Sequence, residues 1–389
     1  PTVSIDRTLA ERPLRTLAAL ADRGDEGPGL VVMAGDQIYA DVWAGVLDIR
    51  DRLEKYTARY QHAFSTPAFR QLASRVPLYM AADDHEVEDA WPKSRSKPGS
   101  TLTRDELWQQ DYVNWAWKTY LGHQRVHGPN EPQGRLAPPR RPSFWYDFAA
   151  GRDGTIAPFL VLDTRFEREY QGGAWRLMSD AQWEHIEGWL RQRLADPDPH
   201  APKFIVSGSV FAPGLARFAA GADGSRQADS WQGFPVERAR LAHRIAELGL
   251  GNVVFVSGDY HCAAVADIAL LRDGGVTESA RAYAVVAPPL YAPFPFVNTR
   301  AREVAVEESI FFPSGHPRHG ERVAQCRARA LEISAGFAMI ACNKVGDHGT
   351  PDDWEIRVEF HKAAWDAERN PASAIVATAL LAKGRANLN

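Results

Sequence analysis

The chain has 389 residues, a length typical of two or three domains or of one large domain with insertions. Apolar residues make up 45% of it, which is enough for a packed core and excludes a wholly disordered chain. The formal net charge is −4 and no long run of like charge occurs, so the sequence has no nucleic-acid-binding signature and its charge balance does not favour binding to an anionic membrane.

Cysteine usage and the start of the chain bear on its compartment. Cys262, Cys326 and Cys342 form no CxxC pair and no even-numbered framework, so we do not expect a disulfide scaffold. No apolar run reaches the ~20 residues that a transmembrane helix needs. No signal-peptide pattern opens the chain, which favours the cytoplasm, but Pro1 is not a natural start and leaves an exported, processed form open.

Helix-like stretches alternate with short apolar runs along the chain. Segment 8–23 has leucines at helical spacing and ends at a glycine-rich stretch, which predicts a helix. Five later runs are typical of buried strands: Leu30–Met33, Leu78–Ala81, Phe159–Leu162, Phe204–Val206 and Val253–Val256. This alternation predicts an α/β fold. Each run is followed at once by glycine or polar residues, the position at which open α/β sheets bind ligands.

Two long irregular zones interrupt this pattern. Residues 128–143 are rich in proline and residues 212–235 are rich in glycine, and long loops in a compact domain are more often functional than incidental. Near the end, Trp354–His361 predicts a β segment, and the apolar run after it predicts a C-terminal helix over 366–389. We interpret residues 1–389 as a single domain with loop insertions.

The first strand-end motif is Gly35-Asp36-Gln37-Ile38-Tyr39. A strand would deliver Asp36 to its tip, where a carboxylate can bridge two cations. Tyr39 reaches the same cation if the chain turns into a helix, and a phenolate is a hard anionic ligand suited to ferric iron. The structural alternative is a helix N-cap aspartate followed by a packed tyrosine.

The second motif is Asp83-Asp84-His85-Glu86, which again follows an apolar run. Three acids around one histidine are costly unless a cation or a proton offsets their charge. Asp84 is therefore a candidate metal ligand. His85 is a candidate proton donor or stabiliser of a transferring phosphoryl group. The structural alternative is a capped helix start, because acidic residues favour the first turn.

The third motif is Ser257-Gly258-Asp259-Tyr260-His261. The spacing of Asp259 and His261 places both side chains on one side of a pleated strand, and a carboxylate with an imidazole is a common ligand pair. The alternative is a strand-end aspartate with a core histidine. Together the three motifs supply enough ligands for a two-metal site of the kind that serves phosphoryl transfer.

These residues resemble a known family. The segments GDQIYAD, DDHEVEDAW, LDTR, DSWQGFPVER and SGDYH, in this order between about Asp6 and His261, are similar to the PhoD-type alkaline phosphatases of the calcineurin-like metallophosphoesterase superfamily. The resemblance implies a four-layer αββα sandwich with long loop insertions. It also implies a dinuclear metal site at the carboxyl edge of the sheet.

The resemblance also implies a role for each candidate residue. Asp36 would bridge two metals, Tyr39 would bind Fe³⁺, and Asp84 would bind a divalent ion such as Ca²⁺, with Zn²⁺ and Mn²⁺ as alternatives. Asp259 and His261 would complete the coordination.

Two further residues would act on the substrate. His85 would stabilise the transferring phosphoryl group, and Arg165 of the LDTR segment would lie near the substrate phosphate. The implied reaction is hydrolysis of a small-molecule phosphate ester by a metal-activated hydroxide. The sequence leaves two alternatives open: a phospholipase-like phosphodiesterase of the same fold, and a non-catalytic binding module.

One part of the family's pattern is missing from this sequence. The pattern begins with a strand that ends in Ser-Cys, upstream of the segment matching Ile5-Asp6-Arg7, and this sequence lacks that strand and its metal-binding cysteine. Either the chain has lost a preceding segment or the site assembles without that ligand. Cys262 adjoins His261, but neighbouring residues point to opposite faces of a strand, so we do not expect it to substitute.

Overall fold

The structure is a computed structural model. It describes residues 2–24, 27–40, 53–92, 110–124, 143–151, 156–171, 174–219, 229–290, 299–350, 353–363, 374–381 and 387–388. The predicted proline-rich loop at 128–143 lies almost wholly outside these residues, and so does part of the loop at 212–235.

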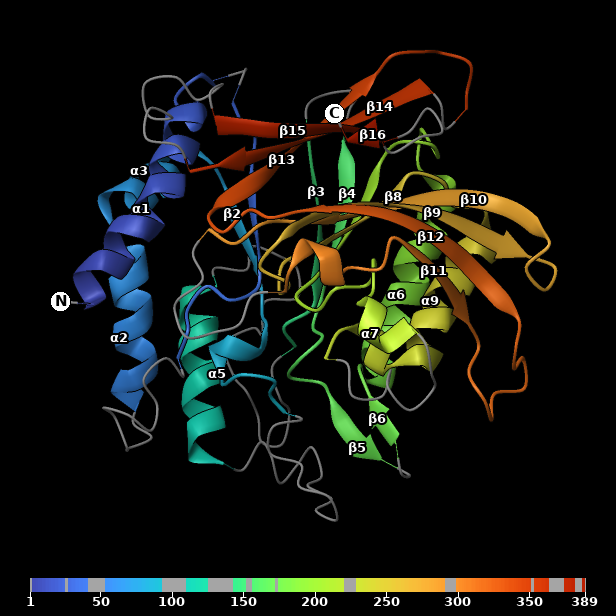
Figure 1. Ribbon diagram of the computed structural model, residues 1–389, viewed down its shortest axis with the longest axis horizontal. Coiled ribbons are helices and arrows are strands. Elements are labelled where there is room, and N and C mark those ends of the chain that lie inside the picture. The colour runs from blue at the N-terminus through green and yellow to red at the C-terminus, as the bar shows by residue number, and fades with distance from the viewer. Residues whose placement is uncertain are drawn as a thin grey trace.

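Figure 1 shows how the helices and strands are arranged. The α-helices are α1 (Thr2–Ala21), α2 (Leu53–Phe64), α3 (Pro67–Arg75), α5 (Asp111–His123), α6 (Asp180–Gln192), α7 (Ala216–Ala219) and α9 (Pro235–Leu248). The strands are β1 (Val31–Ala34), β2 (Leu78–Ala81), β3 (Tyr146–Ala150), β4 (Ala157–Leu162), β5 (Glu169–Gln171), β6 (Ala174–Arg176), β7 (Lys203–Ser207), β8 (Val253–Ser257), β9 (Ala263–Arg272), β10 (Thr277–Val286), β11 (Glu307–Phe311), β12 (Arg322–Leu331), β13 (Gly336–Lys344), β14 (Trp354–Lys362), β15 (Ile375–Leu381) and β16 (Asn387–Leu388).

The largest sheet among the described residues has the strand order β11-β12-β9-β10-β8-β7-β4-β3. Its centre is parallel, because β4 pairs with β7, β7 with β8 and β8 with β10 in the same direction. The outer strands pair antiparallel. The carboxyl ends of β4, β7 and β8 therefore meet at one edge, and the segments that follow them in the chain lie together there.

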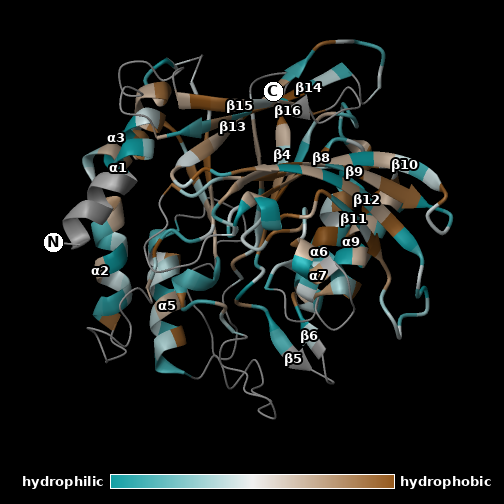
Figure 2. Cartoon of the chain, in the orientation of Figure 1, coloured by the Kyte–Doolittle hydropathy of each residue, from teal (hydrophilic) through white to brown (hydrophobic). Residues whose placement is uncertain are grey.

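Helices cover one face of this sheet and further strands cover the other. Helices α6 and α9 bury Ile186 and Ile245 against sheet residues such as Ile205. On the opposite face, Val206 belongs to the same hydrophobic cluster as Val358 of β14, a strand of the sheet β13-β14-β15-β16. Figure 2 shows hydrophobic residues along the strands between these layers.

The parallel pair β1–β2 extends this second layer, and helices α1 and α3 cover its outer side. Leu17 of α1 and Leu72 of α3 share a cluster with Met80 of β2 and Phe337 of β13. The order of layers is helix, sheet, sheet, helix, which is the αββα sandwich that the resemblance implied. Figure 1 shows α1 and α3 on one flank of the molecule and α6 and α9 on the other.

Local sequence explains where the principal helices begin and end. Ser179 caps α6 by accepting a hydrogen bond from the backbone N–H of Gln182 at 3.2 Å. Helix α9 begins at Pro235, whose missing N–H costs nothing in a first turn, and ends at Gly249 in the left-handed conformation. Each helix leads back from the carboxyl side of the sheet to the start of the next parallel strand, β7 after α6 and β8 after α9.

The predicted strands are confirmed, with bounds that shift by a residue or two, and so are the β segment at Trp354–His361 and the helix around 8–23. The predicted C-terminal helix over 366–389 is wrong for the part that the structure describes. Residues Ile375–Leu381 form β15, which pairs antiparallel with β14 and buries alternate side chains. No described helix is long and apolar enough to cross a membrane.

Candidate metal centre

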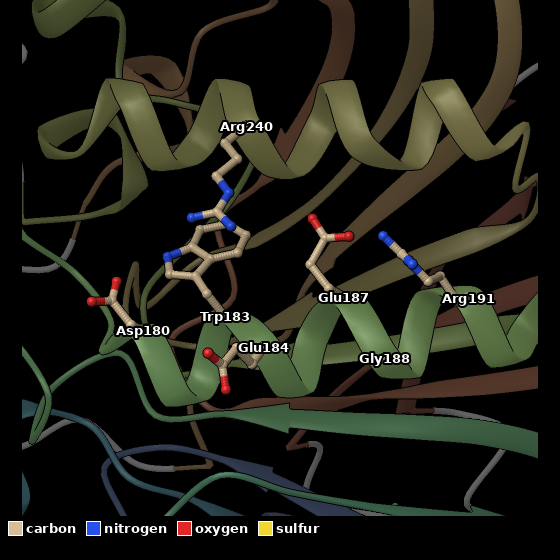
Figure 3. A pocket seen from close by; sticks show the side chains of 7 residues that line it. All are labelled: Asp180, Trp183, Glu184, Glu187, Gly188, Arg191 and Arg240. Atoms are coloured by element: carbon tan, nitrogen blue, oxygen red, sulfur yellow. The ribbon is translucent and has the colours of Figure 1, made fainter.

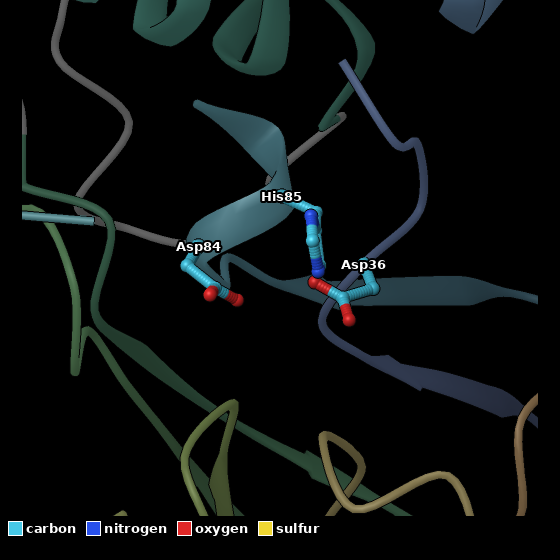
Figure 4. Close-up of side chains that lie close together, drawn as sticks. All are labelled: Asp36, Asp84 and His85. Carbon is cyan, nitrogen blue, oxygen red and sulfur yellow. The ribbon is translucent and has the colours of Figure 1, made fainter. Parts of the chain in front are cut away.

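Three strand ends bring the predicted ligands together. Asp36 follows β1, Asp84 and His85 begin the short 3₁₀ helix η2 (Asp84–Glu86) after β2, and Asp259 follows β8. Ligand atoms of Asp36, Asp84 and His85 lie within 4.8 Å of one another, and so do those of Asp83, Asp84 and Asp259. Figure 4 shows the His85 ring between Asp36 and Asp84, with a ring nitrogen directed at the Asp36 carboxylate.

The backbone at these strand ends adopts conformations that most residues avoid. Asp36, Asp259 and His261 have φ values of 52°, 63° and 55°. A left-handed conformation at a residue other than glycine costs of order 1–3 kcal/mol and is concentrated at functional sites. The backbone is therefore strained at all three of these candidate ligands.

Tyr39 and His261 join the same cluster. The Tyr39 hydroxyl lies 2.9 Å from Nε2 of His261, and this nitrogen lies 3.9 Å from Oδ2 of Asp36. The rings of Tyr39 and His85 are 4.6 Å apart between centroids. Burial, reinforced by the Asp36 carboxylate, raises the pKa of Tyr39 well above its usual value, so the phenol stays neutral unless a cation compensates its charge.

The carboxylates of this cluster are buried and lie close to one another. Burial is the largest cause that raises the pKa of Asp84 to about 6 and that of Asp259 to about 7, and neighbouring carboxylates add to it while Arg165 opposes it. The pKa of Asp83 rises well above its usual value for the same reasons. Burial also acts to raise the pKa of Asp36, but the adjacent imidazoles and Arg165 outweigh it and leave that pKa lowered. The site holds more negative charge than its own cations neutralise.

These residues fit one or more metal cations. Within the described residues, Oδ1 of Asp36 and Oδ2 of Asp83 are buried and have no hydrogen-bond partner, and Oδ1 of Asp84 has no hydrogen bond but lies 3.4 Å from Nη2 of Arg165. Buried carboxylate oxygens are normally paired, and leaving one unpaired costs free energy. A cation bound among them would satisfy these oxygens and offset the excess charge.

Arg165 is the principal cation that the chain itself supplies to this cluster. Its side chain is fully buried, and its guanidinium bonds the carboxylates of Asp83 and Asp229. Its Nη2 lies 3.4 Å from Oδ1 of Asp84 and 3.6 Å from Oδ1 of Asp259. Arg165 thus holds four acids in place, and its expected contact with a substrate phosphate stays a prediction.

Asp163 lies in the turn after β4, two residues before Arg165. Its Oδ1 accepts the backbone N–H groups of Arg165 at 3.0 Å and Phe166 at 2.8 Å. The carboxylate therefore shapes the turn after β4. This is the ordinary behaviour of aspartate in a turn.

Two residues of the cluster were missed as individual candidates. Asp229 bridges Arg165 and Arg168, and Arg168 also donates to the Ser209 hydroxyl at 2.7 Å. Asp229 belongs to the DSWQGFPVER segment and Arg168 follows LDTR, so both lie beside residues that the motifs single out. Their place in or next to these segments was the signal in the sequence, and two buried arginines need acidic partners.

Two other features lie apart from this centre. Cys262 is buried in a hydrophobic cluster with Val210 and Val286 and belongs to neither group of close ligand atoms. A hollow of about 510 Å³ opens on the outer surface of α6 and α9, where Arg240 lies over Trp183 (Figure 3). None of the candidate ligands lines this hollow.

Comparisons with known proteins agree with this geometry. The chain is 26% identical over 223 residues to alkaline phosphatase D of Bacillus subtilis (strain 168), an alignment that covers 54% of this chain and 35% of that protein. The solved structure of PhoD superposes with a TM-score of 0.53 at 16% identity and covers 96% of this chain and 65% of that one. The chain thus spans about a third of the curated relative and less than two thirds of the solved structure.

The family match includes every candidate ligand. The sequence profile of PhoD-like phosphatases matches residues 14–312, a range that contains all three strand-end motifs and the Arg165 segment. This range is most of the chain, and the similarity of fold extends over the remainder. The chain belongs to the PhoD-like phosphatase family.

Proposed function

We propose that this chain hydrolyses phosphate esters at a dinuclear metal centre held by Asp36, Tyr39, Asp84, Asp259 and His261. The observation that carries the proposal is the convergence of three strand-end motifs on buried carboxylate oxygens that have no hydrogen-bond partner among the described residues. Membership of the phosphatase family supports the same reaction. The substrate class is a small-molecule phosphoester.

The identity of the metals is part of this proposal. Tyr39 offers a phenolate, a hard ligand suited to Fe³⁺, and the oxygen-rich group of Asp83, Asp84 and Asp259 suits a hard divalent ion such as Ca²⁺. Zn²⁺ and Mn²⁺ are alternatives, because His261 adds a nitrogen ligand. When bound, two such ions lower the pKa of a coordinated water and neutralise charge on the phosphoryl oxygens.

The chain's own residues would perform three tasks. Asp36 would be shared between the cations, as the family resemblance implies, and Asp84, which belongs to both close groups, would lie between them. The His85 imidazole lies beside Asp36 without needing to be a ligand, so it would hold a proton for the leaving oxygen or stabilise the phosphoryl charge. Arg165 would fix Asp84 and Asp259 at their observed separation.

Two other functions make different predictions. A phospholipase-like phosphodiesterase of the same fold would prefer diesters, and a binding module would hold no stoichiometric metal. The buried, charge-rich centre favours a catalyst over a binding module, because strained backbone and uncompensated acids are expensive to maintain in a passive fold.

The test combines metal content with turnover. We expect the purified chain to bind metal stoichiometrically and to hydrolyse p-nitrophenyl phosphate or bis(p-nitrophenyl) phosphate, and the ratio of the two rates separates monoesterase from diesterase. Asp36→Asn should lose metal and turnover together. The control is Asp353→Asn, a buried aspartate in the turn between β13 and β14 that accepts the Thr350 N–H and should leave both unchanged. A wild-type chain without metal and without turnover on either ester would refute the proposal.

A further inference from the structure

Glu86 joins the two loops that carry the candidate ligands. Its side chain is fully buried, and its two carboxylate oxygens accept four backbone N–H groups. Oε1 accepts from Gln37 at 2.8 Å and from Ile38 at 3.4 Å, both in the loop after β1. Oε2 accepts from Asp36 at 3.2 Å and from Asp83 at 2.7 Å, so it bonds the loops after β1 and β2 at once.

These bonds leave Glu86 no capacity to act as a ligand itself. An ionised carboxylate offers about four lone-pair sites, and four N–H donors occupy them. Consistent with this, Glu86 belongs to neither group of described residues whose ligand atoms lie close enough to share an ion. Its contribution to the centre must therefore pass through the residues whose backbone it holds.

The backbone that Glu86 holds includes a strained residue of the candidate centre, Asp36. Asp36 has φ 52°, a conformation that is unfavourable for a residue with a side chain, and its N–H points at Glu86. Asp83 occupies the matching position after β2, and its N–H makes the shortest of the four bonds. One carboxyl group that bonds backbone in both loops suits the task of holding the two loops together.

We propose that Glu86 is a positioning residue that sets the separation between the ligands Asp36 and Asp84, and thereby sets metal affinity. This inference rests on the proposed metal centre. Glu86 acts as a clamp rather than as a ligand or a source of negative charge. Groups that orient metal ligands from behind typically change metal affinity 10- to 100-fold when they are altered.

Two substitutions distinguish the positioning role of Glu86 from the effect of its charge. Glu86→Gln turns one acceptor into an NH₂ donor, which opposes either the Gln37 and Ile38 donors or the Asp36 and Asp83 donors. Glu86→Asp keeps the charge but is one methylene shorter, about 1.5 Å, so it cannot bond both loops. We expect each variant to bind Mn²⁺ 10- to 100-fold more weakly than the wild-type chain in a calorimetric titration.

The control is a second buried glutamate, which accepts backbone N–H groups of residues that belong to neither group of close ligand atoms. Glu237 on α9 accepts the N–H of Leu177 at 2.6 Å and that of Met178 at 3.3 Å, and also the indole N–H of Trp183. Glu237→Gln should lower the melting temperature of the metal-free chain as Glu86→Gln does, but leave Mn²⁺ affinity unchanged.

The outcomes are distinguishable. If wild-type and Glu237→Gln chains bind Mn²⁺ and Glu86→Gln binds it equally well, the clamp is refuted while the metal centre stands. If Glu86→Asp keeps wild-type affinity while Glu86→Gln loses it, only the charge matters and the clamp is again refuted. If Glu86→Gln fails to fold, Glu86→Asp decides alone. If the wild-type chain binds no Mn²⁺ or other metal, the proposed function itself fails.

Discussion

The position of His85 is compatible with two roles, that of a metal ligand and that of a proton donor. It is nearly fully buried, lies against Tyr39 and shares a 4.8 Å group with Asp36 and Asp84. A ligand and a proton donor can both occupy such a position. The distinction matters because a ligand determines whether metal is present, whereas a proton donor determines what the bound metal can do.

We expect His85→Ala to keep the metals and to lower turnover about 10²-fold or more, the usual scale for an acid–base or electrostatic group. Metal content by elemental analysis and kcat on p-nitrophenyl phosphate measure the two effects separately. The control is His185→Ala on α6, whose imidazole pairs with Asp147 at 3.0 Å outside the centre and whose loss should leave turnover intact. Loss of metal in His85→Ala would make His85 a ligand.

The candidate ligands at the strand ends could each be predicted from the sequence. The residues that hold these ligands in place could not. Asp36, Asp84 and His261 follow apolar runs, so topology alone brought them to one edge. Glu86 is one acid among three in its motif, and nothing in sequence shows that its carboxylate would meet four backbone donors from two loops. Asp229 lies in a motif segment, but its pairing with Arg168 could not be seen in the sequence, because the two residues are 61 positions apart.

At the scale of elements, the error at the C-terminus has a clear cause. The run ASAIVATALL has strong helix formers and also alternates, and a short apolar run does not separate helix from strand by composition. The run forms a strand because β15 pairs with the edge of β14 and so provides hydrogen-bond partners for the backbone of β14. This pairing also buries Ala377, Ala379 and Leu381 in the core between the sheets. Tertiary pairing overrode local propensity.

The loops after β1 and β2 contact each other at Gly35, and this contact leaves no room for a side chain there. A Cβ at Gly35 would lie 2.5 Å from the Cβ of Asp83, and the residue has φ 104°. We expect Gly35→Ala to destabilise the chain by about 2 kcal/mol or more, from overpacking and backbone strain together. Urea unfolding of the metal-free chain measures this.

Gly188 in α6 provides the matched comparison. A Cβ there meets no atom within 4 Å, and alanine is the better helix former, so Gly188→Ala should stabilise the chain by about 0.5–1 kcal/mol. Equal stability of the two alanine variants would mean that the two loops do not meet at Gly35 as the structure has them.

At the scale of the whole molecule, one buried ion pair connects β11, an edge strand of the large sheet, to the segment that carries Asp229 to the candidate metal centre. Arg238 of α9 donates to both oxygens of Glu308 on β11, at 2.6 and 2.7 Å. Glu308 also accepts the N–H of Gly214 at 3.0 Å and the side-chain amide of Gln232 at 3.0 Å. Because Gln232 lies three residues after Asp229, this pair anchors the loop that delivers Asp229 to Arg165.

This pair should make stability depend on pH in a defined direction. Burial acts to raise the pKa of Glu308, but Arg238 and the other donors outweigh it and hold the pKa below the ordinary value of 4.5. A carboxyl group whose pKa is lowered by folding contributes stability that is present above its unfolded pKa and is lost as the pH falls through the folded pKa. The stabilising charge of Glu308 is therefore fully present at neutral pH and disappears only in acid.

Glu308→Gln should cost about 3 kcal/mol at neutral pH, since Arg238 is left buried without its counter-ion. The cost should shrink as the pH falls through the lowered pKa of Glu308, because the wild-type pair then loses its charge as well. Urea unfolding of both chains at neutral and acid pH measures the difference. The control is Glu187→Gln, which breaks a partly exposed pair with Arg244 and should cost less than about 1 kcal/mol at either pH. A cost for Glu308→Gln that stayed constant with pH would show that its hydrogen bonds, and not its charge, anchor the loop.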